Sequence, residues 1–101
     1  MPVALIASAM LKIVERTTGN REVTLQLEGR VVDRWVIEVR RLSDAALARP
    51  GCVLTIDMTG VSFIDAAGVE LFADLQQRRV VLTNCSPFTA EQLNVPGDQA
   101  S

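Results

Sequence analysis

The chain has 101 residues, a formal net charge of −2 and a sequence pI near 5.0. This length predicts one domain with a single buried core. The acidic balance argues against nucleic-acid binding, which needs a basic face to neutralise phosphates. The sequence has no histidine and no tyrosine, so it lacks the commonest general base and the commonest transition-metal ligand. We therefore expect no enzyme activity and no cofactor.

Hydropathy and cysteine usage indicate a cytoplasmic protein. No run of about 18 apolar residues is present, so no membrane insertion is predicted. The opening residues MPVALIASAM are apolar but carry no basic region, which argues against a secretory signal. Cys52 and Cys85 form no Cys-x-x-Cys motif and fit a reducing compartment. We expect both to be free thiols, because they lie at opposite ends of neighbouring predicted strands.

We divide the chain into an apolar N-terminal arm (residues 1–9), a folded domain (10–93) and a flexible C-terminal tail (94–101). The arm is interpreted as a frayed or edge-packed terminus. The alternative is a hydrophobic strip that covers a sheet edge or joins a homodimer. The tail, NVPGDQAS, is polar and contains Pro and Gly.

The domain begins with a predicted β-hairpin. Residues 11–16 resemble a short strand, and the turn residues 17–20 follow it. Over residues 23–31 apolar and polar side chains alternate with period two, which is typical of a half-buried strand.

An amphipathic helix is predicted after the hairpin. Asp33 is a candidate cap, apolar residues recur at spacings of three and four from Trp35 to Leu47, and Pro50-Gly51 ends the helix. Trp35 is interpreted as a core anchor, with stacking against a ligand as the alternative.

A nearly continuous apolar run, residues 52–58, predicts a central parallel strand covered on both faces. We expect a turn at Thr59-Gly60 after it. Asp65 then opens a second helix, because aspartate accepts hydrogen bonds from the free N–H groups of a first turn. Its small first residues leave the helix tip open to contact, and the side chains expected to face inward are Ala67, Leu71, Phe72 and Leu75.

A short strand (80–82) and a short helix (88–93), with Pro87 at its first turn, complete the pattern. The order β-β-α-β-α-β-α predicts an open α/β sheet crossed by both long helices.

The string VLTIDMTGVSFIDAAGVELF (53–72) resembles the signature of STAS domains, the family of anti-sigma-factor antagonists and of sulfate-transporter tails. The resemblance extends from about Leu11 to Leu93. It implies a mixed sheet of about four strands with a β-hairpin start, packed by two long helices and a short C-terminal helix. In the antagonists the loop reads Asp-Ser-Ser-Gly or close to it, and the first serine is the phosphorylation switch. Here Asp65 and Gly68 match, but Ala66 and Ala67 replace both serines.

The resemblance implies a non-enzymatic protein-interaction domain of bacterial signalling and transcription regulation. Such domains dock this loop onto a protein partner, here an anti-sigma factor or a kinase-like protein. Two alternatives are an accessory subunit of a membrane transport system and a small-molecule sensor with a ligand under Trp35. The expected partner-binding residues are Ser62, Asp65, Ala66, Ala67, Gly68 and Val69.

Other polar residues near this segment give weaker signals. Asp57, at a strand end, suggests Mg²⁺ binding or phosphoryl acceptance, but companion oxygen ligands are sparse and Lys12 is the sole lysine. Isolated glycines give no phosphate-binding motif. Thr59 and Ser62 are alternative phosphorylation sites, because phosphate is favoured near a helix N-terminus. Equally, their hydroxyls can bond to local backbone groups.

Overall fold

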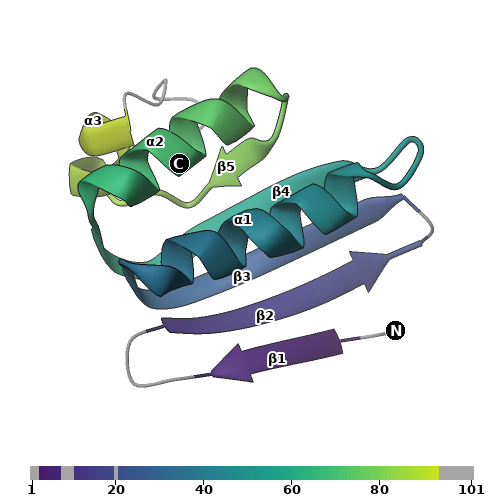
Figure 1. Cartoon of the computed structure of the whole chain (residues 1–101), viewed down its shortest axis with the longest axis horizontal. Helices are drawn as coiled ribbons and strands as arrows, with labels where there is room; N and C mark the ends of the chain where they lie inside the picture. Colours follow the sequence, from purple (N-terminus) through teal and green to yellow (C-terminus); the bar gives the residue numbers. More distant parts are fainter. Residues whose placement is uncertain (1–2, 8–10, 20, 94–101) are drawn as a thin grey trace.

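The computed structural model describes residues 3–7, 11–19 and 21–93, and these form a five-stranded sheet with three helices (Figure 1). This confirms the predicted α/β fold with its hairpin start, two long helices and short C-terminal helix. The tail expected at 94–101 lies outside the described residues. The elements are β1 (Val3–Ala7), β2 (Leu11–Thr18), β3 (Glu22–Val31), α1 (Arg34–Leu47), β4 (Val53–Ile64), α2 (Ala66–Gln77), β5 (Val81–Thr83) and α3 (Pro87–Leu93).

The strands lie in sequence order across the sheet. Strands β1, β2 and β3 are antiparallel neighbours, whereas β3, β4 and β5 are parallel. The sheet thus has one strand more than the four or so expected, because residues 3–7 of the N-terminal arm pair with β2 along its outer edge, Val3 opposite Arg16.

The sheet has a helix face and an open face. Both long helices lie on the helix face, in front of the sheet in Figure 1, as successive right-handed crossovers in one direction require. In β4, Leu54 and Ile56 are buried, whereas Val53 is 52% exposed and Thr55 is half-buried. The expectation that this strand is covered on both faces is therefore wrong. Its apolar run marks a central strand, but alternate side chains lie on the open face.

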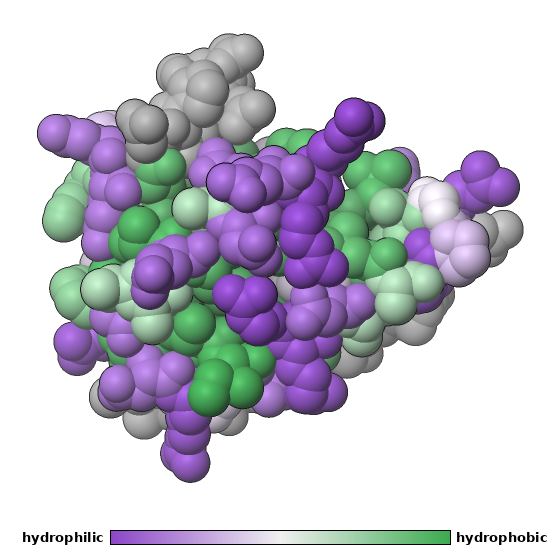
Figure 2. Space-filling model, turned by 45° about the horizontal axis from the view of Figure 1, so that its top comes forward, coloured by the Kyte–Doolittle hydropathy of each residue, from purple (hydrophilic) through white to green (hydrophobic). Residues whose placement is uncertain are grey.

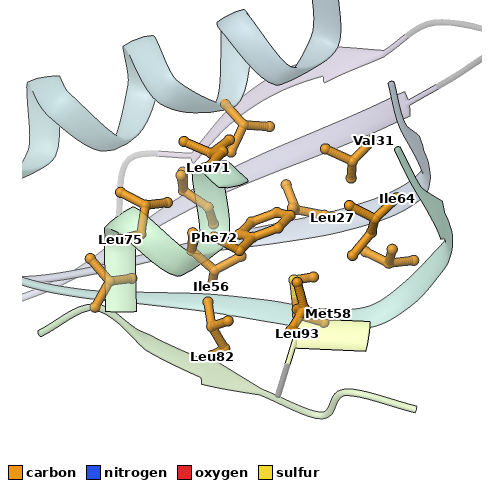
Figure 3. Close-up of a cluster of buried hydrophobic side chains, with 14 of the residues drawn as sticks. Leu27, Val31, Ile56, Met58, Ile64, Leu71, Phe72, Leu75, Leu82 and Leu93 are labelled. Atoms are coloured by element: carbon orange, nitrogen blue, oxygen red, sulfur yellow. The ribbon is translucent and has the colours of Figure 1, made fainter. Parts of the chain in front are cut away.

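The core lies between the helix face and the helices, with Phe72 of α2 in its middle (Figure 3). Phe72 is fully buried, and its burial contributes about 3 kcal/mol by the area it removes from water. The side chains labelled around it come from β3, β4, α2, β5 and α3: Leu27, Val31, Ile56, Met58, Ile64, Leu71, Leu75, Leu82 and Leu93.

The turn expected at Thr59-Gly60 is also wrong, because β4 continues through it to Ile64. Two register shifts against β3 accommodate the extra residues as β-bulges. At the first bulge the Asp57 carboxylate accepts a hydrogen bond from the Thr59 N–H at 2.9 Å. Gly60 permits close approach of β3, since a Cβ there would lie 3.0 Å from Cα of Glu28. The polar residues that suggested a turn thus form a bulge.

Asp33 does occupy the position before α1, but its side chain makes no capping hydrogen bond and its φ is 52°. Its expected role as a side-chain cap is therefore wrong. Trp35, in the first turn of α1, is partly buried and packs against the core, in agreement with its interpretation as an anchor.

Candidate functional site

The candidate site is the α2 tip, defined as Ser62 and residues 65–69. Its centre is the Asp65 carboxylate, which caps α2 as predicted: Oδ1 accepts a hydrogen bond from the Gly68 N–H at 2.8 Å. The second oxygen, Oδ2, accepts one from the Asp33 N–H at 3.0 Å. One carboxylate therefore fixes the starts of both α1 and α2.

Two further hydrogen bonds involve the backbone of the same segment. The Asp65 N–H donates to the carbonyl oxygen of Val31 at 3.2 Å, which ties the tip to the end of β3. Gln92 of α3 donates from Nε2 to the carbonyl oxygen of Ile64 at 2.8 Å. Because the partners come from β3 and α3 as well as α1, the position of the tip is determined by the whole fold.

The first residues of α2 divide between surface and core. Ala66 and Ala67 are exposed, so the expectation that Ala67 faces inward is wrong. Gly68 is the buried residue of this turn, and a Cβ there would lie 2.6 Å from Cγ2 of Ile64. Val69 is half-buried and packs against the core. The exposed surface of this first turn is therefore formed by the methyl groups of Ala66 and Ala67.

The two hydroxyls considered for phosphorylation lie at different places on β4. The exposed Ser62 belongs to the tip and donates from Oγ to the carbonyl oxygen of Gly29 at 3.2 Å. Thr59 lies five residues before the strand end, about 15 Å along the strand, and its hydroxyl donates to Oδ1 of Asp57 at 2.5 Å. Both hydroxyls thus make hydrogen bonds, but neither bonds to a local backbone group as expected: Thr59 bonds to a side-chain carboxylate, and Ser62 bonds to the backbone of the neighbouring strand.

Asp57 belongs to a separate network on the bulge. Its Oδ1 accepts hydrogen bonds from Thr59 and also from Nδ2 of Asn84 at 3.1 Å. Partial burial raises the pKa of the Asp57 carboxyl, but the hydrogen bonds from Thr59 and Asn84 together outweigh it and bring the pKa below its ordinary value. Within the described ranges no group of three or more His, Cys, Asp or Glu side chains is placed to hold a metal ion.

A pair of side chains beside the tip was not predicted from the sequence. Arg30 of β3 lies opposite Phe63 of β4, and its guanidinium carbon is 5.3 Å from the centre of the phenyl ring. Phe63 is 45% exposed. The contact depends on the register of two strands 33 residues apart, which no local pattern reveals. Arg30 lies at the end of a predicted strand, but Phe63 lies five residues beyond the end predicted for the next one, so no signal in the sequence indicates that they pair.

Trp35, suggested above as cover for a ligand, is partly buried in the structure. Trp35 packs on the core, and the Arg34 guanidinium carbon lies 5.2 Å from its ring. A surface hollow of about 180 Å³ is lined by other residues: Glu15, Ala45, Ala46 and Arg49.

The cysteines are free thiols, as expected. Cys52 is half-buried and Cys85 is buried. Burial raises the pKa of the Cys85 thiol, which disfavours its reactive thiolate form. In the part of the chain that the structure describes, no helix has the length and apolar content to cross a membrane.

Comparison with known proteins connects this geometry to a family. The model of the family described as "Mlab, STAS domain" matches residues 14–97. The anti-sigma factor antagonist SpoIIAA in its unphosphorylated form is a similar solved structure, with 19% identity, 83% of each chain covered and a TM-score of 0.67. Murine Slc26a9, an anion transporter in the inward-facing state, shows 18% identity over 75% of this chain but 14% of its own, with a TM-score of 0.58. No curated protein sequence matches.

Proposed function

Because this chain belongs to the family described as "Mlab, STAS domain", we propose that it is a non-enzymatic domain that docks its α2 tip onto a protein partner. The observation that carries the proposal is the state of Asp65. Both oxygens of its carboxylate accept backbone N–H bonds, so the conspicuous acidic residue of the tip is structural. Its effect is to present the exposed Ala66 and Ala67 in a fixed position, and preorganised small side chains suit a surface that accepts a partner closely.

We propose a role in cytoplasmic bacterial signalling, as an antagonist-like domain that acts on an anti-sigma factor or a kinase-like protein and so on transcription. The fold shared with SpoIIAA supports this assignment. By the resemblance of the loop, Ala66 corresponds to the serine that is the phosphorylation switch of the antagonists. Alanine has no hydroxyl, so this chain stays competent for docking unless it is regulated at another residue.

Ser62 is the hydroxyl of the α2 tip itself and is exposed, so it is the stronger of the two alternative phosphorylation sites. A phosphate there would add a charge of about −1.5 to −2 beside the docking surface. Thr59, held by the Asp57 carboxylate on the bulge, is the weaker one. Phosphopeptide mapping after incubation with cell extract and ATP distinguishes them.

A second candidate function is that of an accessory subunit in a membrane transport system. The similarity to a domain-sized part of Slc26a9 favours it. Both functions use the fold as a docking module, and they differ in the partner. A soluble ATP-binding kinase-like partner would support signalling, whereas a transporter ATPase or permease would support transport.

The test replaces Ala66 by aspartate. A carboxylate in the first turn of α2 is tolerated or favoured by the helix dipole by about 0.3–1 kcal/mol, so the thermal melt should change little. Burying that charge against a partner without a counter-charge costs several kcal/mol, and each ~1.4 kcal/mol is tenfold in affinity.

The full-length protein captures its partner from the source cell, and the identified partner is then purified for calorimetry. Ala66→Asp should lose binding, whereas Arg41→Glu, on the exposed side of α1, should retain it. If Ala66→Asp binds as tightly as the unmodified protein, the α2 tip is not the docking surface.

A further inference from the structure

The pair formed by Arg30 and Phe63 has the form of a recognition element. The two residues lie opposite each other on β3 and β4, with the guanidinium 5.3 Å from the ring centre. Both are on the open face of the sheet and both are exposed. Stacking on the ring restricts the long arginine side chain, so less conformational entropy is lost when the guanidinium binds a further group.

The guanidinium has no carboxylate partner among the described residues. Two residues earlier on the same face of β3 is Glu28, and its carboxylate pairs with Lys12 at 3.5 Å. The other described ion pairs involve α1, α2 and Arg78, which directly follows α2, and Arg30 belongs to none of them. The Arg30 charge is therefore left to solvent, beside an exposed aromatic ring.

The pair adjoins the α2 tip on both strands. Phe63 follows Ser62 directly in β4, and Arg30 precedes Val31, whose carbonyl oxygen accepts the Asp65 N–H. On the side of the molecule that carries the helices, seen in Figure 2, exposed apolar side chains lie between hydrophilic ones. A partner that is seated on Ser62 and Ala66 and extends around the ends of β3 and β4 onto the open face would meet Arg30 and Phe63.

We infer that the partner carries an aspartate or glutamate that pairs with Arg30, next to an apolar recess that receives Phe63. The inference rests on the proposed docking function and adds the chemistry of the partner. A guanidinium presents its N–H groups as a planar fork that matches a carboxylate in two parallel hydrogen bonds. The net charge of −2 opposes a phosphate-covered surface such as nucleic acid, whereas a single acidic side chain needs one cation.

The experiment uses the purified partner from the capture described above and measures its affinity for variants by calorimetry. We expect Arg30→Ala and Phe63→Ala each to weaken binding about tenfold, and Arg30→Glu to weaken it at least a hundredfold. The matched control is Arg21→Glu, an equal charge reversal about 30 Å away at the other end of β3, which should stay within twofold. Thermal melts verify that each variant is folded.

A charge exchange identifies the contact directly. Exposed acidic residues of the partner are replaced one at a time by arginine. One of these partner variants should bind Arg30→Glu at least tenfold more tightly than the unmodified partner does. The inference is overturned if Arg30→Glu binds within twofold of the unmodified protein, or no more weakly than Arg21→Glu. Loss of binding by Ala66→Asp with retention by Arg30→Glu would reject this inference and leave the proposed function intact. Retention by Ala66→Asp would reject the proposed function itself.

Discussion

Removal of the Asp65 carboxylate should destabilise both helix starts at once. Loss of an aspartate cap costs about 1 kcal/mol. The hydrogen bond from the Asp33 N–H to the same charged group, 3.0 Å long, adds about 1.5 kcal/mol. We therefore expect Asp65→Ala to lower the free energy of unfolding by about 2–3 kcal/mol. In a domain of this size that loss lowers Tm by about 10–20 °C.

Asp65→Asn divides this loss between the two oxygens. The asparagine oxygen can still accept the Gly68 N–H, but its NH₂ group then faces the Asp33 N–H and cannot accept from it. We expect a loss of about 1.5 kcal/mol.

Urea unfolding followed by far-UV circular dichroism measures the stabilities, and hydrogen exchange provides a residue-specific readout. The amides of Asp33 and Gly68 should both exchange faster in Asp65→Ala, and mainly that of Asp33 in Asp65→Asn. The control is Glu70→Ala, an exposed carboxylate of the same helix, which should change the stability by less than about 0.5 kcal/mol. If Asp65→Ala is as stable as this control, the carboxylate does not hold the two helices.

Two further predictions concern packing and thiol chemistry. Gly68→Ala should destabilise the protein by about 1–2 kcal/mol in urea unfolding. The new Cβ would lie 2.6 Å from Cγ2 of Ile64 and 3.1 Å from the Val31 carbonyl oxygen, and the cost of this overpacking exceeds the gain of about 1 kcal/mol in helix propensity. A variant as stable as the unmodified protein would contradict this geometry. Without reductant, thiol titration in denaturant should find two free thiols. In the folded protein Cys52 should react with the thiol reagent faster than the buried Cys85. Equal reaction rates in the folded protein would contradict the placement of the two cysteines.

The parts of the fold that sequence reasoning predicted are those governed by local patterns. Period-two alternation identified the strand ending at Val31, and the capping role of Asp65 follows from its place before a helical pattern. The second hydrogen bond of Asp65 joins residues 32 positions apart, so no local pattern contains it.

The errors at the candidate site have a common physical cause. The apolar side chain of Ala67 predicts a core position, but Gly68 occupies the inward position, where a Cβ would lie 2.6 Å from Cγ2 of Ile64. A similar close approach explains Gly60, which suggests a turn by its sequence but permits β3 to approach at Glu28. In both places a glycine marks where backbones approach closely, and its neighbours in space decide its role.

The two bulges in β4 have a consequence for which changes of length the chain tolerates. Buried positions are even-numbered up to Met58, odd-numbered at Val61 and even-numbered again at Ile64, so each bulge exchanges the faces and the second restores the original phase. β4 has two residues more than β3 between the Gln26–Asp57 and Val31–Ile64 pairs, one in each bulge, so removing one residue here can eliminate a bulge while Ile64 stays opposite Val31. Alignments of related chains should therefore show gaps of one residue at either bulge, and of no more than two residues in all.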